Sequence, residues 1–219
     1  MALTPSEQAS VDFLNFQLIP DLVCAQTGVV NFDLFPQARP DVVALSIGGN
    51  SHNVLGMFNH PRPFAIGDPE HGRIPDDPAR TFIPLDAVHA MFVQNMAALF
   101  GHADQIHARY PGVPFLYLSP PPPIKDEAHI RAHPGVFAEK LDLGFSPPAL
   151  RRALYAAQGH AYARQAAQHA ATLIPAPAQA MTPDGFLDLA FAAKDPTHGN
   201  PAYGRLVLEQ IETFMEAAA

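Results

Sequence analysis

Two short apolar segments, each closed by a turn, frame the first half of this chain. Residues 41–47 read Asp-Val-Val-Ala-Leu-Ser-Ile and lead into Gly48-Gly49. Residues 113–119 read Val-Pro-Phe-Leu-Tyr-Leu-Ser and lead into four prolines. Short apolar runs bounded by glycine and proline are typical of strands buried on both faces. Residues 85–110, between the two runs, carry apolar side chains at helical spacing, which predicts a strand-helix-strand unit.

The same alternation continues in the second half of the chain. A weaker apolar run at 171–175 predicts a third strand. Ser146 followed by two prolines predicts the start of a helix that runs to about Ala170, because a hydroxyl caps the helix and proline fits its first turn. Asn200-Pro201 opens a final amphipathic helix. Strands that alternate with helices predict an α/β fold with a mostly parallel sheet covered on both faces.

Composition supports one globular domain over residues 1–219 and excludes several partners. Hydrophobic residues make up 48% of the chain and charged residues 16%. The 13 basic residues are outnumbered by 21 acidic ones, and the net charge of -8 argues against nucleic-acid and membrane partners. The chain has one cysteine and no secretory signal pattern at its start, so we expect a cytoplasmic protein without disulfides.

Two proline-rich segments are predicted to be loops. Residues 61–84 have little periodicity and follow the glycine turn, so they form either a substrate-contacting loop or a solvated insertion. Pro120 to Pro123 are predicted to be a rigid segment leaving the second strand, rather than a polyproline ligand.

The glycine turn after the first strand lies where α/β sheets bind ligands. Gly48-Gly49-Asn50-Ser51-His52-Asn53 follows the carboxyl end of that strand. Glycines let backbone N–H groups approach an anion, and the Asn50 amide adds a side-chain donor, as oxyanion stabilisation requires. A polar glycine turn after a strand is also common in proteins without such a site.

A second candidate is Asp195-Pro196-Thr197-His198, just before the final helix. A turn of this spacing can bring the carboxylate to the imidazole, where it orients the ring and stabilises the imidazolium. His198 is then a general base. Asp-Pro is also an ordinary turn dipeptide.

Together these motifs resemble the SGNH (GDSL) hydrolases, a family of esterases and lipases. Gly48-Gly49-Asn50 resembles the family's third block, and Asp195-Pro-Thr-His198 resembles its fifth. Leu116-Tyr-Leu-Ser-Pro-Pro is similar to the family's fourth strand, and the resemblance covers about residues 40–215. It implies a flavodoxin-like three-layer sandwich, with no metal or organic cofactor, that acts on carboxylic or acetyl esters of small molecules or carbohydrates.

The resemblance also implies roles for single residues. His198 is the general base, Asp195 orients it, and Asn50 donates to the oxyanion. The family's second block supplies a glycine N–H, a role that the resemblance assigns to Gly28. Ser51 stands where the family usually has aspartate, so the chain departs from the third block there.

The chain departs from the family most clearly at the nucleophile. Family members have a first strand that ends in Gly-Asp-Ser or a variant, whereas residues 1–27 contain no glycine and only Ser6 and Ser10. Three explanations stay open. The chain begins after that strand, or it is a non-catalytic descendant, or Ser51 has become the nucleophile.

Cysteine and histidine offer weaker alternatives. Cys24 could serve as a thiol nucleophile, but in its apolar segment we expect a small core residue. His52, His60 and His71, with Asp68 and Glu70, lack the spacing of helical metal ligands and are expected in loops or facing solvent. We expect His160 and His169 on the surface.

Overall fold

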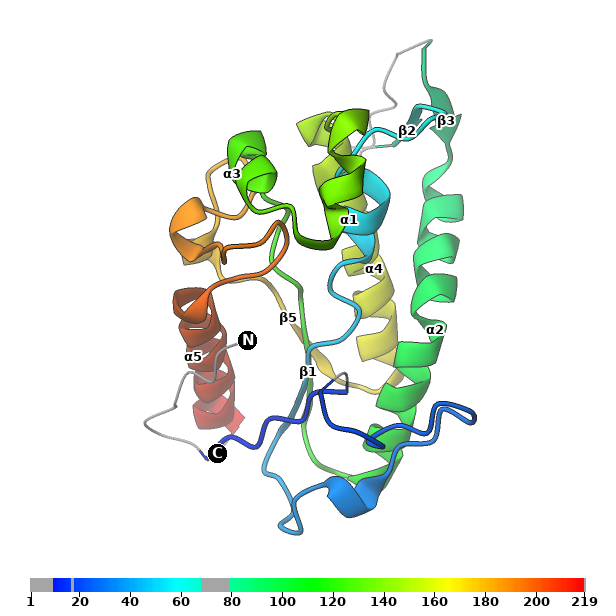
Figure 1. Cartoon of the computed structure of the whole chain (residues 1–219). Coiled ribbons are helices and arrows are strands. Elements are labelled where there is room, and N and C mark those ends of the chain that lie inside the picture. The colour runs from blue at the N-terminus through cyan, green and yellow to red at the C-terminus, as the bar shows by residue number, and fades with distance from the viewer. Residues whose placement is uncertain (1–9, 17, 68–78, 219) are drawn as a thin grey trace.

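The protein has a mixed α/β fold (Figure 1), described by a computed structural model over residues 10–16, 18–67 and 79–218. Its α-helices are α1 (Ser51–Gly56), α2 (Leu85–Arg109), α3 (Glu127–Ala132), α4 (Pro148–Gln168) and α5 (Pro201–Ala218). Its strands are β1 (Val43–Leu45), β2 (Phe64–Ile66), β3 (Thr81–Ile83), β4 (Phe115–Leu118) and β5 (Thr172–Ile174). Short 3-10 turns lie at Phe32–Leu34, Gly135–Leu143, Ala178–Ala180 and Leu189–Phe191.

A three-stranded parallel sheet forms the centre of the molecule. Its order is β1-β4-β5, with Val43 opposite Phe115 and Leu116 opposite Thr172. The three predicted strands and the three predicted long helices are therefore confirmed. The strands are shorter than the apolar runs, because pairing in β1 stops at Leu45 and the chain then turns through Gly48.

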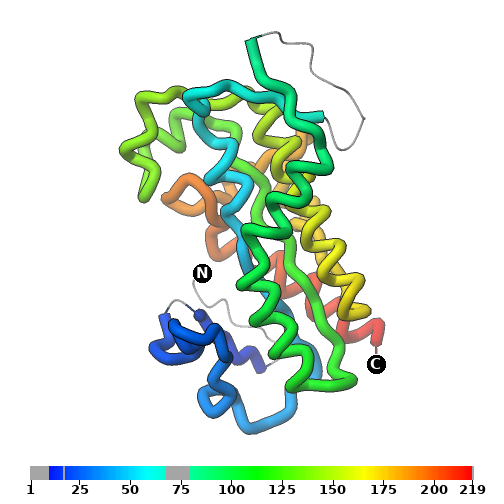
Figure 2. The backbone as a smooth tube through the Cα atoms, turned by 90° about the vertical axis from the view of Figure 1, so that its right-hand side faces the viewer, coloured from blue at the N-terminus to red at the C-terminus, as the bar shows by residue number. Residues whose placement is uncertain are grey.

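Helices α2 and α4 pack side by side on one face of the sheet (Figure 2). Their apolar faces and the strands share the larger core, in which Phe92, Met96 and Tyr117 are fully buried. Helix α5 lies on the other side of the strands (Figure 1). A second core cluster joins it to the segments that follow β4 and α1, with Met57, Ile124, Ile130, Leu187 and Tyr203 at its centre. These two clusters hold the carboxyl ends of β1 and β4 between them.

The segment 61–84 is not a continuous loop as predicted. Strands β2 and β3 within it pair in parallel, with Phe64 opposite Thr81, while residues 68–78 lie outside the described part of the chain. The prolines after β4 behave as expected of a rigid segment. Pro120, Pro122 and Pro123 are buried, which is incompatible with an exposed polyproline ligand.

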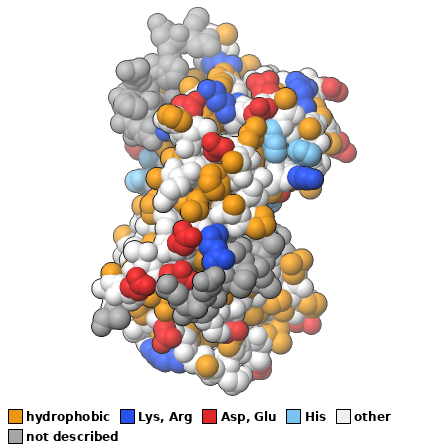
Figure 3. All heavy atoms as spheres, turned by 90° about the vertical axis from the view of Figure 1, so that its left-hand side faces the viewer, with side chains coloured by type: hydrophobic (Ala, Val, Ile, Leu, Met, Phe, Trp, Pro, Cys, Tyr) orange, Lys and Arg blue, Asp and Glu red, His pale blue; other side chains and the backbone are white. Residues whose placement is uncertain are grey.

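On the face that Figure 3 shows, described lysines and arginines lie among acidic and apolar side chains, and histidines gather in its upper part. None of the described helices combines the length and apolarity that crossing a membrane requires.

A side chain at Gly48 would strain the turn after β1. Its φ of +64° is in the left-handed region, and an added Cβ would lie 3.0 Å from Met96 Cε. We therefore expect Gly48→Ala to lower the free energy of unfolding by about 1–2 kcal/mol. Gly101→Ala, inside α2 with open space around it, is expected to raise it by up to about 1 kcal/mol. Urea unfolding of both variants tests this, and equal effects would contradict it.

Candidate active site

Asn50 lies in the turn after β1, and its side chain does not cap the helix that follows. Asn50 is the N-cap of α1, and its side chain makes no capping hydrogen bond. Its carbonyl oxygen accepts from Val54 N at 3.0 Å, so the backbone starts the helix without the side chain. Ser51 Oγ donates back to Gly48 O at 3.4 Å. The amide of Asn50 is thus available as a donor, and the Ser51 hydroxyl contacts its own turn.

His52 is buried beneath this turn, not in a solvent-facing loop as the sequence suggested. It is 2% exposed, and its Nδ1 lies 2.9 Å from Gln158 Oε1 on α4. Gln158 Oε1 also accepts from His52 N at 2.7 Å, which fixes the amide orientation and makes Nδ1 the protonated ring nitrogen. Burial is the main reason that the pKa of His52 falls to about 4, against the weaker opposing effect of its hydrogen bonds. His52 is therefore neutral at physiological pH.

The segment Asp195 to His198 forms a closed turn around one carboxylate oxygen. Asp195 Oδ1 accepts from the backbone N–H groups of Thr197 and His198, both at 2.8 Å. The same oxygen lies 3.1 Å from His198 Nδ1. Thr197 Oγ1 lies 3.2 Å from that nitrogen. A carboxylate held against Nδ1 leaves Nε2 as the ring nitrogen that can take a proton.

The exposure of His198 and the charge of Asp195 are compatible with a general base that is accessible to a small molecule. The His198 side chain is 62% exposed and that of Asp195 33%. Burial opposes ionisation of Asp195, but the Thr197 and His198 backbone donors and the nearby imidazole outweigh it, so the pKa of the carboxyl lies below its usual value. His129 Nε2, from α3, contacts the Asp195 carbonyl oxygen at 3.1 Å and fixes the turn from the other side. The carboxylate is therefore charged and oriented at neutral pH.

The second core cluster lies between the two motifs. Met57, at the end of α1, and Tyr203, in the first turn of α5, both belong to it. Asn50 precedes α1 and His198 precedes α5, so the cluster sets the relative position of the two turns. The hydrogen bonds of Ser51 and His198 stay within their own turns. The structure thus brings Asp195 and His198 together. Among the described residues, no hydrogen bond or ion pair joins Asn50 or Ser51 to them.

Comparisons with protein-family models, with curated proteins and with solved structures gave no match. The likeness to SGNH hydrolases therefore rests on the sequence motifs and stays a prediction.

Gly28 lies apart from Asn50, beside the C-terminal half of α2. Gln105 Nε2 donates to Gly28 O at 3.0 Å, and Gln105 Oε1 accepts from Val30 N at 2.9 Å. The only pairing of Gly28's loop is an isolated antiparallel bridge between Val23 and Val30, among described residues, so no parallel strand carries it to the sheet. The oxyanion role that the resemblance assigns to Gly28 stays a prediction without a structural contact behind it.

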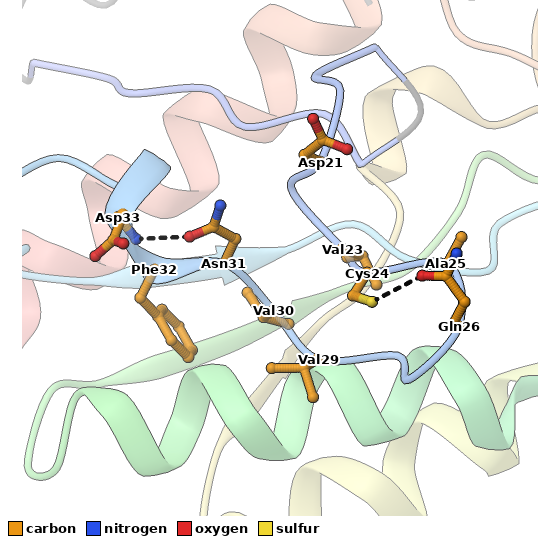
Figure 4. Close-up of a pocket in the computed structure, with 10 residues that line it drawn as sticks. All are labelled: Asp21, Val23, Cys24, Ala25, Gln26, Val29, Val30, Asn31, Phe32 and Asp33. Atoms are coloured by element: carbon orange, nitrogen blue, oxygen red, sulfur yellow. Dashed lines mark hydrogen bonds between the residues drawn. The ribbon is translucent and has the colours of Figure 1, made fainter.

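Cys24 is not the core residue that its apolar segment suggested. An open cavity of about 690 Å³ lies against residues 21–33, and Cys24 lines it together with Asp21, Asn31 and Asp33 (Figure 4). Cys24 Sγ donates to Gln26 Oε1 at 3.3 Å. The buried residue of this segment is Leu22, at 0% exposure. Cys24 belongs to the loop beside α2, whereas His198 belongs to the turn before α5.

Two histidines, His160 on α4 and His169 just after it, contact residues of α2. His169 is not a surface residue as predicted, since its side chain is 11% exposed and contacts Asp104 Oδ1 at 2.8 Å and Tyr117 Oη at 2.9 Å. His160 is exposed, as predicted, and stacks on His89. Of the residues considered with His52 and His60, three (Asp68, Glu70 and His71) lie outside the described residues. In the part of the chain that is described, no group of three or more His, Cys, Asp or Glu could hold a metal ion.

Helix α4 supplies residues that the sequence analysis missed. One side of it carries a polar row at alternating spacings of four and three, which we call the α4 polar row: Arg151, Tyr155, Gln158, Tyr162, Gln165 and His169. Their regular spacing marked them as one helix face, but polar side chains on an alanine-rich helix are usually solvent-facing. Arg151, Gln158 and Tyr162 are at most 2% exposed. The row therefore faces the sheet.

Proposed function

We propose that this protein is an ester hydrolase of the SGNH type, acting on carboxylic or acetyl esters. The observation that carries the proposal is the 3.1 Å contact between Asp195 Oδ1 and His198 Nδ1 in an exposed turn. A charged carboxylate behind Nδ1 and an accessible imidazole make a general base of the kind used in acyl transfer. The Asn50 amide, uncommitted at the carboxyl end of β1, supplies the oxyanion donor.

The sheet supports the same family. Flavodoxin-like sheets have the parallel order 2-1-3-4-5. The order β1-β4-β5 fits the last three strands of such a sheet, with the Asn50 turn after the first of them and the final helix after the His198 turn. In this interpretation the three-layer sandwich has α2 and α4 on one face and α5 on the other.

In the proposed reaction a hydroxyl attacks the ester carbonyl and His198 takes its proton. Asp195 stabilises the imidazolium, and Asn50 donates to the oxyanion that forms. His198 then returns the proton to the leaving alcohol, which leaves an acyl enzyme for water to hydrolyse. Ser51 is the hydroxyl beside Asn50, and its weak 3.4 Å contact to Gly48 O has to break before it can attack.

One observation favours a second candidate, a binding domain that keeps the fold and the Asp195–His198 turn without the chemistry. The Ser51 hydroxyl turns to Gly48 O, while His198 is occupied by Asp195 and Thr197. A base without a nucleophile in contact is what a non-catalytic descendant would retain.

A fluorophosphonate probe separates the two candidates, because it modifies only an activated hydroxyl. We expect the wild type to hydrolyse a short-chain nitrophenyl ester and to carry the probe on Ser51. Ser51→Ala should lose both signals. Ser119→Ala, at the end of β4, is the matched control and should keep them. Turnover without an adduct on Ser51 would mean that another residue is the nucleophile. A wild type with neither turnover nor adduct overturns the hydrolase proposal in favour of the binding domain.

A further inference from the structure

The buried side of α4 is fastened to the segments that leave β1 and β4. Arg151 donates to Ile124 O at 2.9 Å and to Lys125 O at 3.2 Å. Tyr155 Oη donates to Pro120 O at 3.0 Å. These carbonyl groups belong to irregular backbone outside the sheet, so they have no neighbouring strand as a hydrogen-bond partner. Side chains of α4 supply the donors instead. The first half of the α4 polar row thus holds, by hydrogen bonds, the loops that follow the carboxyl ends of the strands.

Gln158 has a special position in this row because it contacts both sides of Asn50. Its Nε2 donates to Gly48 O at 2.9 Å, and its Oε1 accepts from His52 N at 2.7 Å. Gly48 and His52 are each two residues from Asn50. Gln158 is 0% exposed, its bond to His52 N is buried and its bond to Gly48 O is partly buried. Bonds of this kind are costly to break, because each leaves a buried polar group unpaired.

The same segment is held from two further directions. Tyr162 Oη donates to Ile47 O, one residue before Gly48. Gly48 packs so closely on α2 that an added Cβ would lie 3.0 Å from Met96 Cε and 3.2 Å from Leu99 Cδ1. The backbone from 47 to 52 is therefore fixed between α2 and α4, while the Asn50 side chain itself makes no cap bond. This arrangement immobilises the residue and leaves its donor group for a ligand.

We propose that Gln158 is a positioning residue, which holds Asn50 where its amide can donate to the oxyanion of the ester reaction. The inference rests on the proposed function for its chemistry and on the two hydrogen bonds for its geometry. Preorganised donors stabilise a transition state without reorganisation when charge develops. Loss of the Gln158 bonds would therefore reduce kcat more than it weakens substrate binding.

The test compares Gln158→Leu with Gln165→Leu in kinetics. Gln165 lies two turns further along the same helix face, is 6% exposed and bonds Asp104 Oδ1 at 2.8 Å, so its loss removes a similar side chain. We expect Gln158→Leu to lower kcat by about 10- to 100-fold with KM within about twofold. Gln165→Leu should keep kcat within about twofold at a similar loss of melting temperature. Equal effects of both variants on kcat would mean that Gln158 is merely structural.

A double-mutant cycle shows whether Gln158 acts through Asn50. In an Asn50→Ala background, Gln158→Leu should lower kcat by no more than about twofold, because the donor that it positions is already gone. Additive losses would overturn the proposal. Gln158→Glu, which keeps the volume and the acceptor but loses the amide donor to Gly48, serves if the leucine variant does not fold.

Amide hydrogen exchange tests the positioning without catalysis. The Val54 N–H donates to Asn50 O, so its exchange rate reports how firmly Asn50 is held. We expect exchange at Val54 to be at least about tenfold faster in Gln158→Leu and unchanged in Gln165→Leu. Unchanged exchange in both overturns the positioning role. Accelerated exchange in a protein without ester turnover overturns the hydrolase function and keeps the structural part of the inference.

Discussion

Asp195→Ala is expected to lower kcat/KM for a short-chain ester by about 10³- to 10⁴-fold, because one oxygen of this residue does two things. Asp195 Oδ1 orients the imidazole through Nδ1, and it also accepts the backbone N–H groups of Thr197 and His198. The alanine variant loses the orientation of the base and the turn that presents it. Steady-state kinetics with a nitrophenyl ester measures the effect.

Asp195→Asn is the matched control for this experiment. Its amide oxygen can still accept the backbone N–H groups of Thr197 and His198, so the turn persists. What is lost is the carboxylate that selects the Nδ1–H tautomer of His198 and stabilises the imidazolium. Where a carboxylate orients a catalytic imidazole, this exchange leaves the geometry intact yet lowers kcat by about 10⁴-fold, so we expect a loss of about 10³- to 10⁴-fold here as well. An asparagine variant that keeps most of the wild-type activity would show that the carboxylate does not hold the base as we describe.

The strands and long helices could be predicted because their signals are local. Short apolar runs next to glycine or proline identify β1 and β4, and helical spacing over 25 residues identifies α2. The Asp195 turn is local as well, since its hydrogen bonds span at most three residues. In contrast, β2 and β3 are three residues each in a segment rich in proline, which is too short for any periodicity to appear.

The errors concern residues whose environment depends on distant segments. His52 and Gln158 are 106 positions apart, and neither is recognisable as buried until the two are paired. His169 follows the end of α4 like a surface residue, but α2 supplies Asp104 to cover it. In the segment around Cys24 the apolar residues are adjacent, and their order does not show that Leu22 is the buried one. Local sequence patterns alone do not predict which distant residues contact one another.

The same network that holds the Asn50 turn should make the protein labile to acid. His52 has a pKa of about 4 in the folded protein, against 6.5 for an exposed histidine, because burial disfavours the imidazolium. Around it lie the neutral Gln158 amide and the Tyr155 ring, which contacts it edge-on, so no carboxylate compensates a buried proton. Protonation of His52 in the folded state therefore has no favourable partner.

Between pH 6.5 and 4 the unfolded chain binds a proton at His52 that the folded chain does not. The contribution of His52 to the free energy of unfolding should thus be complete above pH 6.5. The free energy of unfolding should then decrease by about 3 kcal/mol as the pH falls to 4. Desolvation and His160 lower the pKa of His89 as well, which adds to the loss in the same direction. Urea unfolding at pH 7, 6, 5 and 4.5 measures the slope. His52→Asn, which keeps a donor for Gln158, should flatten it, and the exposed control His60→Asn should not; an unchanged slope in His52→Asn would refute this origin of the acid lability.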